Sequence, residues 1–261
     1  MIVSSHQNGW KIITQRSHGL LAAMIAYQYS IDLPVEVMVP LLIAVSEHDD
    51  GVTETLADQN LTAAGAPRSF TVANGNHITN LTPLRSLMEI SNAKSQLNGL
   101  LNSLHIKFLY DRDNRKTDKG LDRFLKDQEK YRTAVLKNLH LTKKDADGLY
   151  RILEWCDACS LLICLDKIQA DEKKMEIAES TDGDMSRVHY KPNKDICVEP
   201  WPFKSTSFNV FYEYKIVEQL QFKSIENFNE VCKATKVQQQ VFTFSKYGSV
   251  FINAVVGVIT Y

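Results

Sequence analysis

The residues of this sequence that could do chemistry are histidines and aspartates on the apolar faces of segments with a helical pattern. In the segment 34–50, steps of three and four residues carry the apolar stripe through Val45 to the adjacent pair His48 and Asp49. Burying a charged carboxylate is costly unless it is paired or binds a metal ion. The stretch AVSEHDDGV therefore requires a partner for Asp49.

Three other segments place an ionisable side chain in the same way. His18 begins the apolar stripe of the first helical segment, His105 follows the leucines of a later one, and Asp157 lies within the longest one. A single buried histidine or aspartate is usually satisfied by an ordinary hydrogen bond. One shared cation explains the whole group more simply, because it neutralises the acids and uses the lone pairs of neutral imidazoles.

The ligand types narrow the identity of that cation. Two histidines with two aspartates suit Mn, Fe, Co, Ni or Zn better than Ca or Mg, which prefer oxygen ligands alone. Four protein ligands leave open positions on an octahedral ion, which can lower the pKa of a bound water and polarise a phosphoryl oxygen. We therefore expect a site for a divalent transition metal, with the ligands His18, His48, Asp49 and Asp157.

Helices must position these residues, and the periodicity predicts them through most of the chain. The helical pattern covers residues 17–30, 34–50, 82–113 (as a pair), 121–140 and 143–167. The apolar pattern then breaks, and runs typical of strands follow at residues 186–191, 195–200, 208–218 and 237–246. We predict a mainly α protein, in which a helical metal-site domain (residues 1–175) precedes a small β-rich C-terminal region (residues 176–261) packed on it.

Length, charge and cysteine usage exclude several classes of protein. The 261 residues suffice for one large domain or for a domain with a smaller appendage. The formal net charge of −1 gives no attraction to nucleic acid or to an anionic membrane. No apolar run approaches the ~20 residues of a membrane-spanning helix, and the N-terminus lacks a secretory signal pattern. Five cysteines, an odd number, fit reduced thiols, so the expected location is the cytoplasm.

The order His18, then His48-Asp49, then the distant Asp157, on separate helices, resembles the HD superfamily of metal-dependent phosphohydrolases. A wider similarity connects the chain to a bacterial domain-of-unknown-function family with this HD-like pattern. Its landmarks here are GWKIITQRSHGLLAAMIA, LLIAVSEHDDG, SLHIKFLYDR, CDACSLLICLD and VEPWPF. The resemblance implies an HD-like helical bundle core with a metal site, and a small phosphorylated substrate such as a nucleotide.

Candidate catalytic residues surround the expected ligands. Arg16 could meet an anionic substrate near a helix N-terminus, and Arg112 could clamp a phosphate, although either could equally be a surface residue. His105 could be a further ligand, a general acid or a phosphate contact. Asp50 or Glu47 could act as general base through a bound water, but a solvated helix end is the favoured interpretation of Glu47.

The leading hypothesis for function is a metal-dependent hydrolase of a phosphate ester. The alternatives are a non-catalytic sensor or interaction domain with an HD-like core and, as a third choice, a di-iron oxygenase. Cys156 and Cys159 form a C-x-x-C pair, but it falls inside an apolar helix, where cysteine behaves as a small hydrophobe. The stretch PWPF, residues 200–203, predicts a rigid connection that packs the C-terminal strands onto the helices.

Overall fold

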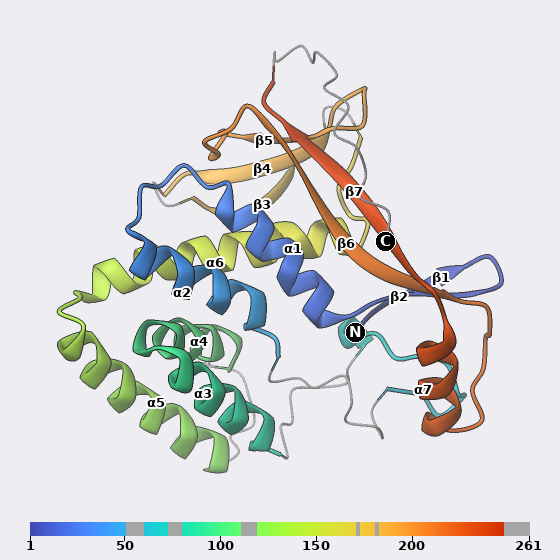
Figure 1. The fold of residues 1–261 in the computed structure, drawn as a ribbon, viewed down its shortest axis with the longest axis horizontal. Helices are drawn as coiled ribbons and strands as arrows, with labels where there is room; N and C mark the ends of the chain where they lie inside the picture. The colour runs from blue at the N-terminus through green and yellow to red at the C-terminus, as the bar shows by residue number, and fades with distance from the viewer. Residues whose placement is uncertain (51–59, 73–79, 111–118, 171–172, 181–182, 248–261) are drawn as a thin grey trace.

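The computed structural model describes residues 1–50, 60–72, 80–110, 119–170, 173–180 and 183–247, which form helices packed on one sheet (Figure 1). The helices are α1 Gln15–Tyr27, α2 Val35–Glu47, α3 Thr82–Lys94, α4 Gln96–Tyr110, α5 Lys119–Asn138, α6 Lys143–Cys164 and α7 Ile225–Ala234, with a 3-10 turn at Phe70–Val72. The strands are β1 Ile2–His6, β2 Gly9–Ile13, β3 Met175–Glu179, β4 Met185–Tyr190, β5 Ile196–Glu199, β6 Ser207–Val217 and β7 Val237–Ser245.

The described strands form one seven-stranded mixed sheet in the order β1-β2-β6-β7-β5-β4-β3. The predicted mainly α fold with an HD-like bundle is therefore wrong, because the sheet is a full layer of the molecule. Its first two strands come from the N-terminus, where β1 and β2 form a hairpin and β2 continues the sheet onto β6. The division of the chain at residue 175 stays a prediction, although the sheet takes strands from both sides of it.

Four helices form the layer that carries the ionisable residues. α1 packs against α2 and α6, and α4 packs against the same two helices. Figure 1 shows α1 and α6 next to the sheet, with the other helices of this layer beyond them. The start of α1 is fixed twice, since Thr14 accepts a hydrogen bond from the Ser17 backbone N–H and the Ser17 hydroxyl bonds both backbone groups of Glu213 in β6.

Aromatic side chains fasten the sheet to the helices. Phe203, in the stretch PWPF, packs edge-on against Trp155 of α6 with 5.7 Å between ring centroids, and against Tyr29 at 6.0 Å. On its other side it meets Phe244 of β7 at 5.6 Å. Such edge-to-face pairs add to the burial of the rings themselves. The connection after β5 therefore packs between the two layers, and α6 is held against the sheet close to Asp157.

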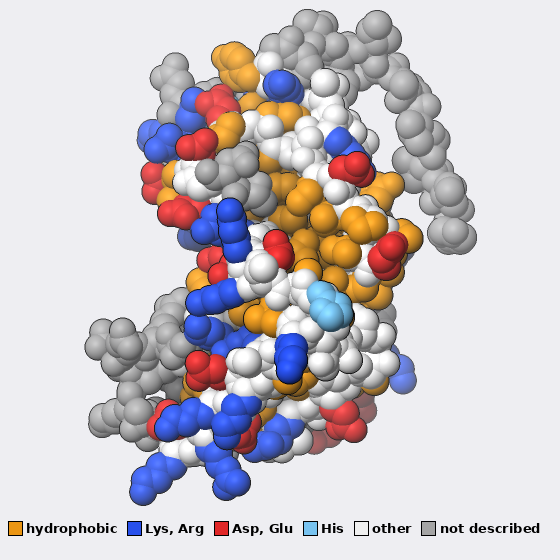
Figure 2. All heavy atoms as spheres, turned by 90° about the vertical axis from the view of Figure 1, so that its left-hand side faces the viewer, with side chains coloured by type: hydrophobic (Ala, Val, Ile, Leu, Met, Phe, Trp, Pro, Cys, Tyr) orange, Lys and Arg blue, Asp and Glu red, His pale blue; other side chains and the backbone are white. Residues whose placement is uncertain are grey.

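The helical end of the molecule has a solvated, charged face. α5 buries only a narrow stripe, Leu121, Phe124 and Val135. Figure 2 shows Lys and Arg side chains gathered on the lower part of the face, where α5 lies. Among the described helices, none is both long and apolar enough to cross a membrane.

Candidate metal centre

Three of the four expected ligands meet at a single carboxylate oxygen. His18 lies near the start of α1, His48 is the C-cap of α2, and Asp157 lies within α6. The Nε2 atoms of His18 and His48 are each 3.2 Å from Oδ1 of Asp157. The structure thus brings α1, α2 and α6 together at one point.

The carboxylate of Asp49 faces all three imidazoles from the other side. Its Oδ2 is 3.6 Å from Nε2 of His48 and 3.9 Å from Nδ1 of His18, and its Oδ1 is 3.9 Å from Nε2 of His105 on α4. The potential ligand atoms form two groups that share His48. One group adds His18 and Asp157 and the other adds Asp49 and His105, and within each group the atoms lie within 4.8 Å of one another. Ligands ~2.1 Å from one ion are at most about twice that far apart, so small movements suffice to enclose a cation.

Four of the six ring nitrogens in this cluster are buried and have no hydrogen-bond partner among the described residues. His18, His48 and His105 expose 0%, 2% and 1% of their surface. In the part of the chain that the structure describes, no hydrogen bond reaches either ring nitrogen of His18, Nε2 of His48, Nε2 of His105 or Oδ1 of Asp157. Burying one unsatisfied polar atom costs on the order of 1–3 kcal/mol, so a group of them needs an explanation. A cation would satisfy the lone pairs, and the donor set fits one.

Neighbouring groups orient the imidazoles and carboxylates. Nδ1 of His48 lies 2.7 Å from the Val45 carbonyl oxygen, to which it can only donate, so in the neutral, metal-binding form of the ring the Nε2 lone pair faces Asp157. Gln15, one turn before His18 on α1, donates from Nε2 to Oδ2 of Asp49 at 2.9 Å. Its position three residues before His18 was the available sequence signal for this contact.

His105 has its own partner on α6. Its Nδ1 lies 3.3 Å from the hydroxyl of Tyr150, seven residues before Asp157 on the same face of that helix. Burial raises the pKa of Tyr150, so its hydroxyl stays protonated. The seven-residue spacing between Tyr150 and Asp157 is the signal in the sequence for this contact.

The ionisable groups of the cluster shift one another strongly. Burial opposes the charged form of His48, but the carboxylates of Asp49 and Asp157 outweigh it and raise the pKa of His48 to about 10. Burial also opposes the ionisation of Asp157, but the neighbouring His48 and His18 lower its pKa well below the usual range. Burial, and then the charge on His48, lower the pKa of His105 to about 4. Cationic charge is therefore favoured between the two carboxylates, while His105 is neutral.

A glycine allows the two histidine-bearing helices to approach. Gly19 follows His18, and a Cβ atom built on it would lie 2.2 Å from the backbone oxygen of Ser46. A side chain at this position would push α1 away from the end of α2. The short sequence His18-Gly19 thus sets the distance between His18 and His48.

Glu47, next to His48, is buried, so our expectation of a solvated helix end was wrong. It exposes 5% of its surface and accepts hydrogen bonds from the Ser91 hydroxyl at 2.9 Å and from Nδ2 of Asn102 at 3.1 Å. Lys94 forms an ion pair with the same carboxylate. The pair and its hydrogen bonds fix the end of α2 to α3 and α4, so Glu47 positions the segment that carries His48 and Asp49.

The predicted catalytic residues Arg16 and Asp50 contact each other at the edge of the cluster. Nε of Arg16 lies 3.5 Å from Oδ1 of Asp50, and their side chains are 68% and 35% exposed. Burial, which the charge on Arg16 opposes, raises the pKa of Asp50. Arg112 lies outside the described residues.

The pair Cys156 and Cys159 lies in the core of α6. Both are fully buried, and burial raises the pKa of each thiol far above the usual range. Thiolates are the reactive form, and among the described residues neither cysteine belongs to a group of His, Cys, Asp and Glu side chains that could hold a metal ion.

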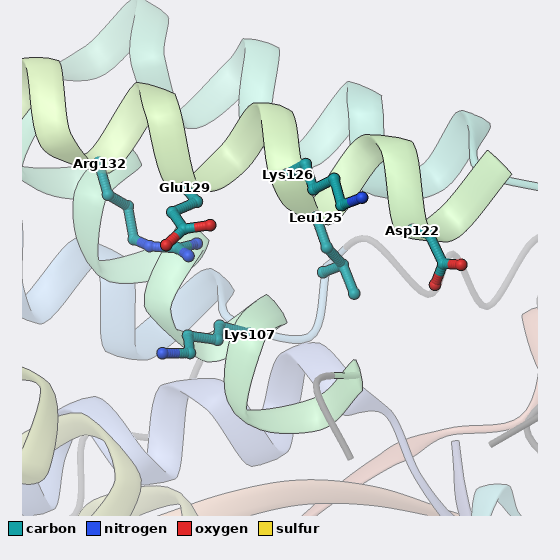
Figure 3. Close-up of a pocket in the computed structure, with 6 residues that line it drawn as sticks. All are labelled: Lys107, Asp122, Leu125, Lys126, Glu129 and Arg132. Carbon is teal, nitrogen blue, oxygen red and sulfur yellow. The ribbon is translucent and has the colours of Figure 1, made fainter. Parts of the chain in front are cut away.

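A separate groove is lined by α4 and α5 (Figure 3). Its lining residues carry three cations and two acids and include none of the cluster; they are Lys107, Asp122, Leu125, Lys126, Glu129 and Arg132. Arg132 is engaged by Ser103, whose hydroxyl and backbone oxygens both accept from it. The mixed charge is that of a solvated helix pair, and the groove offers no second catalytic constellation.

Residues 1–219 match a family described as a protein of unknown function (DUF3891). The chain belongs to this family. No curated protein and no solved structure matches the chain. The expected membership of a domain-of-unknown-function family is thus confirmed. The matched DUF3891 region contains every residue of the histidine–aspartate cluster and ends before α7 and β7.

Proposed function

We propose that this protein of the DUF3891 family is a metal-dependent hydrolase of a phosphate ester, with its metal held by His18, His48, Asp49 and Asp157. The observation that carries the proposal is the group of buried, unpartnered nitrogens around two carboxylates. A divalent transition ion suits these nitrogen and oxygen donors, and when bound it supplies a Lewis acid that polarises a phosphoryl oxygen.

The residues of the chain have separate tasks in this proposal. Gln15 and the Val45 carbonyl hold Asp49 and His48 in the orientation that ligation needs. His105 is neutral near pH 7, because its pKa is about 4, and its Nε2 points at Asp49. It therefore offers the substrate a hydrogen bond without adding a charge. Arg16, which is exposed and paired with Asp50, would turn to an incoming phosphate in this proposal, and Arg112 stays a proposed second phosphate contact.

The order of ligands along the chain supports the choice of reaction. A histidine, a His-Asp pair and a distant aspartate, each from a separate helix, are the pattern of HD-superfamily phosphohydrolases. Here the helices α1, α2 and α6 that carry these residues pack on one another, together with α4 and its His105. The similarity to HD-superfamily enzymes is one of side-chain order on the helices, and the sheet is not part of it.

One observation favours a second candidate, a non-catalytic sensor. The three imidazoles are fully buried, and the side chains of Asp49 and Asp157 are only 18% and 13% exposed. Structural metal sites are closed in this way, whereas catalytic ones keep an open position. A sensor would bind the same ion and release no product.

Metal content and phosphate release, measured on the same preparations, test the proposal. The protein is stripped with a chelator, reloaded separately with Mn, Fe, Co, Ni or Zn, and incubated with phosphate monoesters and nucleotides. Asp157→Asn is the variant, and Asp147→Asn, on the same helix but outside the cluster, is the matched control. We expect turnover in the wild type and the control and none in Asp157→Asn, which should also bind less metal than the control.

Each other outcome of this experiment decides against the hydrolase. Stoichiometric metal without turnover favours the sensor, and dioxygen consumption by the iron form favours an oxygenase. Absence of metal from the wild type overturns the metal centre altogether.

A further inference from the structure

A second group of ligand-type side chains lies on the sheet. His189 is on β4, and Cys197 and Glu199 are on β5. His189 and Cys197 are direct cross-strand partners in the antiparallel register, and Glu199 lies two residues further along β5. Since side chains alternate along a strand, all three project from the same face of the sheet.

This face is the one turned away from the main core. The alternate residues Val188, Ile196 and Val198 are buried in the core cluster that the sheet shares with α1 and α6. Side chains opposite such a core are usually solvated and polar. His189 and Cys197 are instead 4% and 0% exposed, so a titratable and a nucleophilic group are both buried on the outer face.

The three side chains converge closely. A ring nitrogen of His189, Sγ of Cys197 and a carboxylate oxygen of Glu199 lie within 4.8 Å of one another. Among the described residues, none forms a hydrogen bond with Nδ1 of His189, although this atom is buried. A buried unsatisfied ring nitrogen beside a thiol and a carboxylate is the pattern that a bound cation would satisfy.

We propose that His189, Cys197 and Glu199 form a zinc site, separate from the cluster on the helices. A thiolate, an imidazole and a carboxylate are the three ligand types that Zn²⁺ accepts, and the thiolate selects it over Mg²⁺, Ca²⁺ and Mn²⁺. The thiolate and the carboxylate also balance the two positive charges of the ion.

The surroundings limit how tightly this site can bind. Glu199 forms an ion pair with Lys174, and Arg187, its register partner on β4, pairs with Glu176 of β3. A carboxylate has two oxygens, so Glu199 can keep Lys174 on one and offer the other to the ion. Nearby cations oppose a metal ion, so the negative charge of the thiolate is essential. Cys197 is therefore the ligand on which the proposal depends most.

Cobalt binding distinguishes this site from the one on the helices. Co²⁺ bound by a thiolate gives an intense sulfur-to-metal charge-transfer band in the near ultraviolet, which histidine and carboxylate ligands do not give. The chelator-stripped full chain is titrated with Co²⁺ and then with Zn²⁺. We expect the band in the wild type and in Asp157→Asn, its loss in Cys197→Ser, and its displacement by Zn²⁺.

The control is Cys232→Ser, which removes a partly buried cysteine outside the cluster and should keep the band. Circular dichroism checks that each variant folds. If Cys197→Ser does not fold, Glu199→Gln serves instead, and it should weaken Zn²⁺ binding roughly tenfold or more. No band in the wild type, an equal band in Cys197→Ser, loss of the band in Cys232→Ser, or unchanged Zn²⁺ affinity in Glu199→Gln would each overturn the proposal.

Discussion

The cluster on the helices and the cluster on the sheet hold similar side chains by different means. His18, His48 and Asp157 come from three helices and meet only because those helices pack closely. His189 and Cys197 are register partners on adjacent strands, and the hydrogen-bonded ladder alone sets their distance. The geometry of the helical cluster therefore depends on tertiary packing, and that of the sheet cluster on secondary structure.

The two clusters also differ in charge. The imidazoles on the helices face two carboxylates, which raise the pKa of His48 to about 10 and so favour a cation. On the sheet, Glu199 already has Lys174 as a partner. A metal ion should consequently bind the helical cluster more tightly, and changes in helix packing should affect that cluster alone.

The largest expected effect is the loss of metal from the helical cluster in Asp157→Asn. The substitution keeps the shape of the side chain but removes the carboxylate that contacts both His18 and His48. The variant should stay folded, because the buried charge and its desolvation cost disappear together. Thermal melting with chelator and with metal checks this. The wild-type midpoint should rise with metal more than that of the variant, and equal responses would remove Asp157 from the ligands.

A smaller effect is expected when the helices are pushed apart by Gly19→Ala. The new Cβ atom would lie 2.2 Å from the Ser46 backbone oxygen, and such overpacking costs about 1–3 kcal/mol. Metal affinity should fall as His18 moves away from His48. The matched control is Gly148→Ala in α6, where a Cβ atom meets nothing within 4 Å. This substitution should stabilise the helix by roughly 0.5–1 kcal/mol. Denaturant unfolding measures the stability of both variants. Equal changes in stability would contradict the role of Gly19 in the approach of α1 to α2.

Gln15→Ala tests the helical cluster without changing a ligand. Gln15 donates a hydrogen bond to Asp49 and orients its carboxylate. Loss of such a supporting contact typically lowers metal affinity about 10–100-fold. Isothermal titration should show this decrease for the helical cluster, while the cobalt–thiolate band of the sheet cluster stays unchanged. A decrease at both clusters would indicate general loosening of the fold instead.

The sequence was informative about the helical cluster because helix periodicity is local. The stripes through Leu21 and Val45 place His18 and His48 on inward faces, and the structure buries both. That these faces meet depends on how helices pack, which the stripes do not specify. Periodicity therefore supplied candidates, and only the structure supplied their distances.

The sheet was less predictable because strand register is not local. The hairpin of β1 and β2 closes locally through the two-residue turn Gln7-Asn8, but the pairing of β2 with β6 joins residues about two hundred positions apart. For the same reason, no spacing in the sequence indicated that His189 opposes Cys197. The predicted mainly α fold failed at this point, since it treated the strands as an appendage to the helices.

The smallest expected effect on metal binding comes from the cysteine pair that adjoins the helical cluster. Cys156 and Cys159 flank Asp157, but both thiols are fully buried, and burial raises their pKa. Replacing both with Ala should cost on the order of 1 kcal/mol for each lost sulfur. It should leave the metal stoichiometry and the cobalt–thiolate band intact. Only Cys197→Ser should remove the band. A double variant that folds but loses metal would instead show that α6 supplies thiolate ligands, and the histidine–aspartate cluster would then no longer account for the metal.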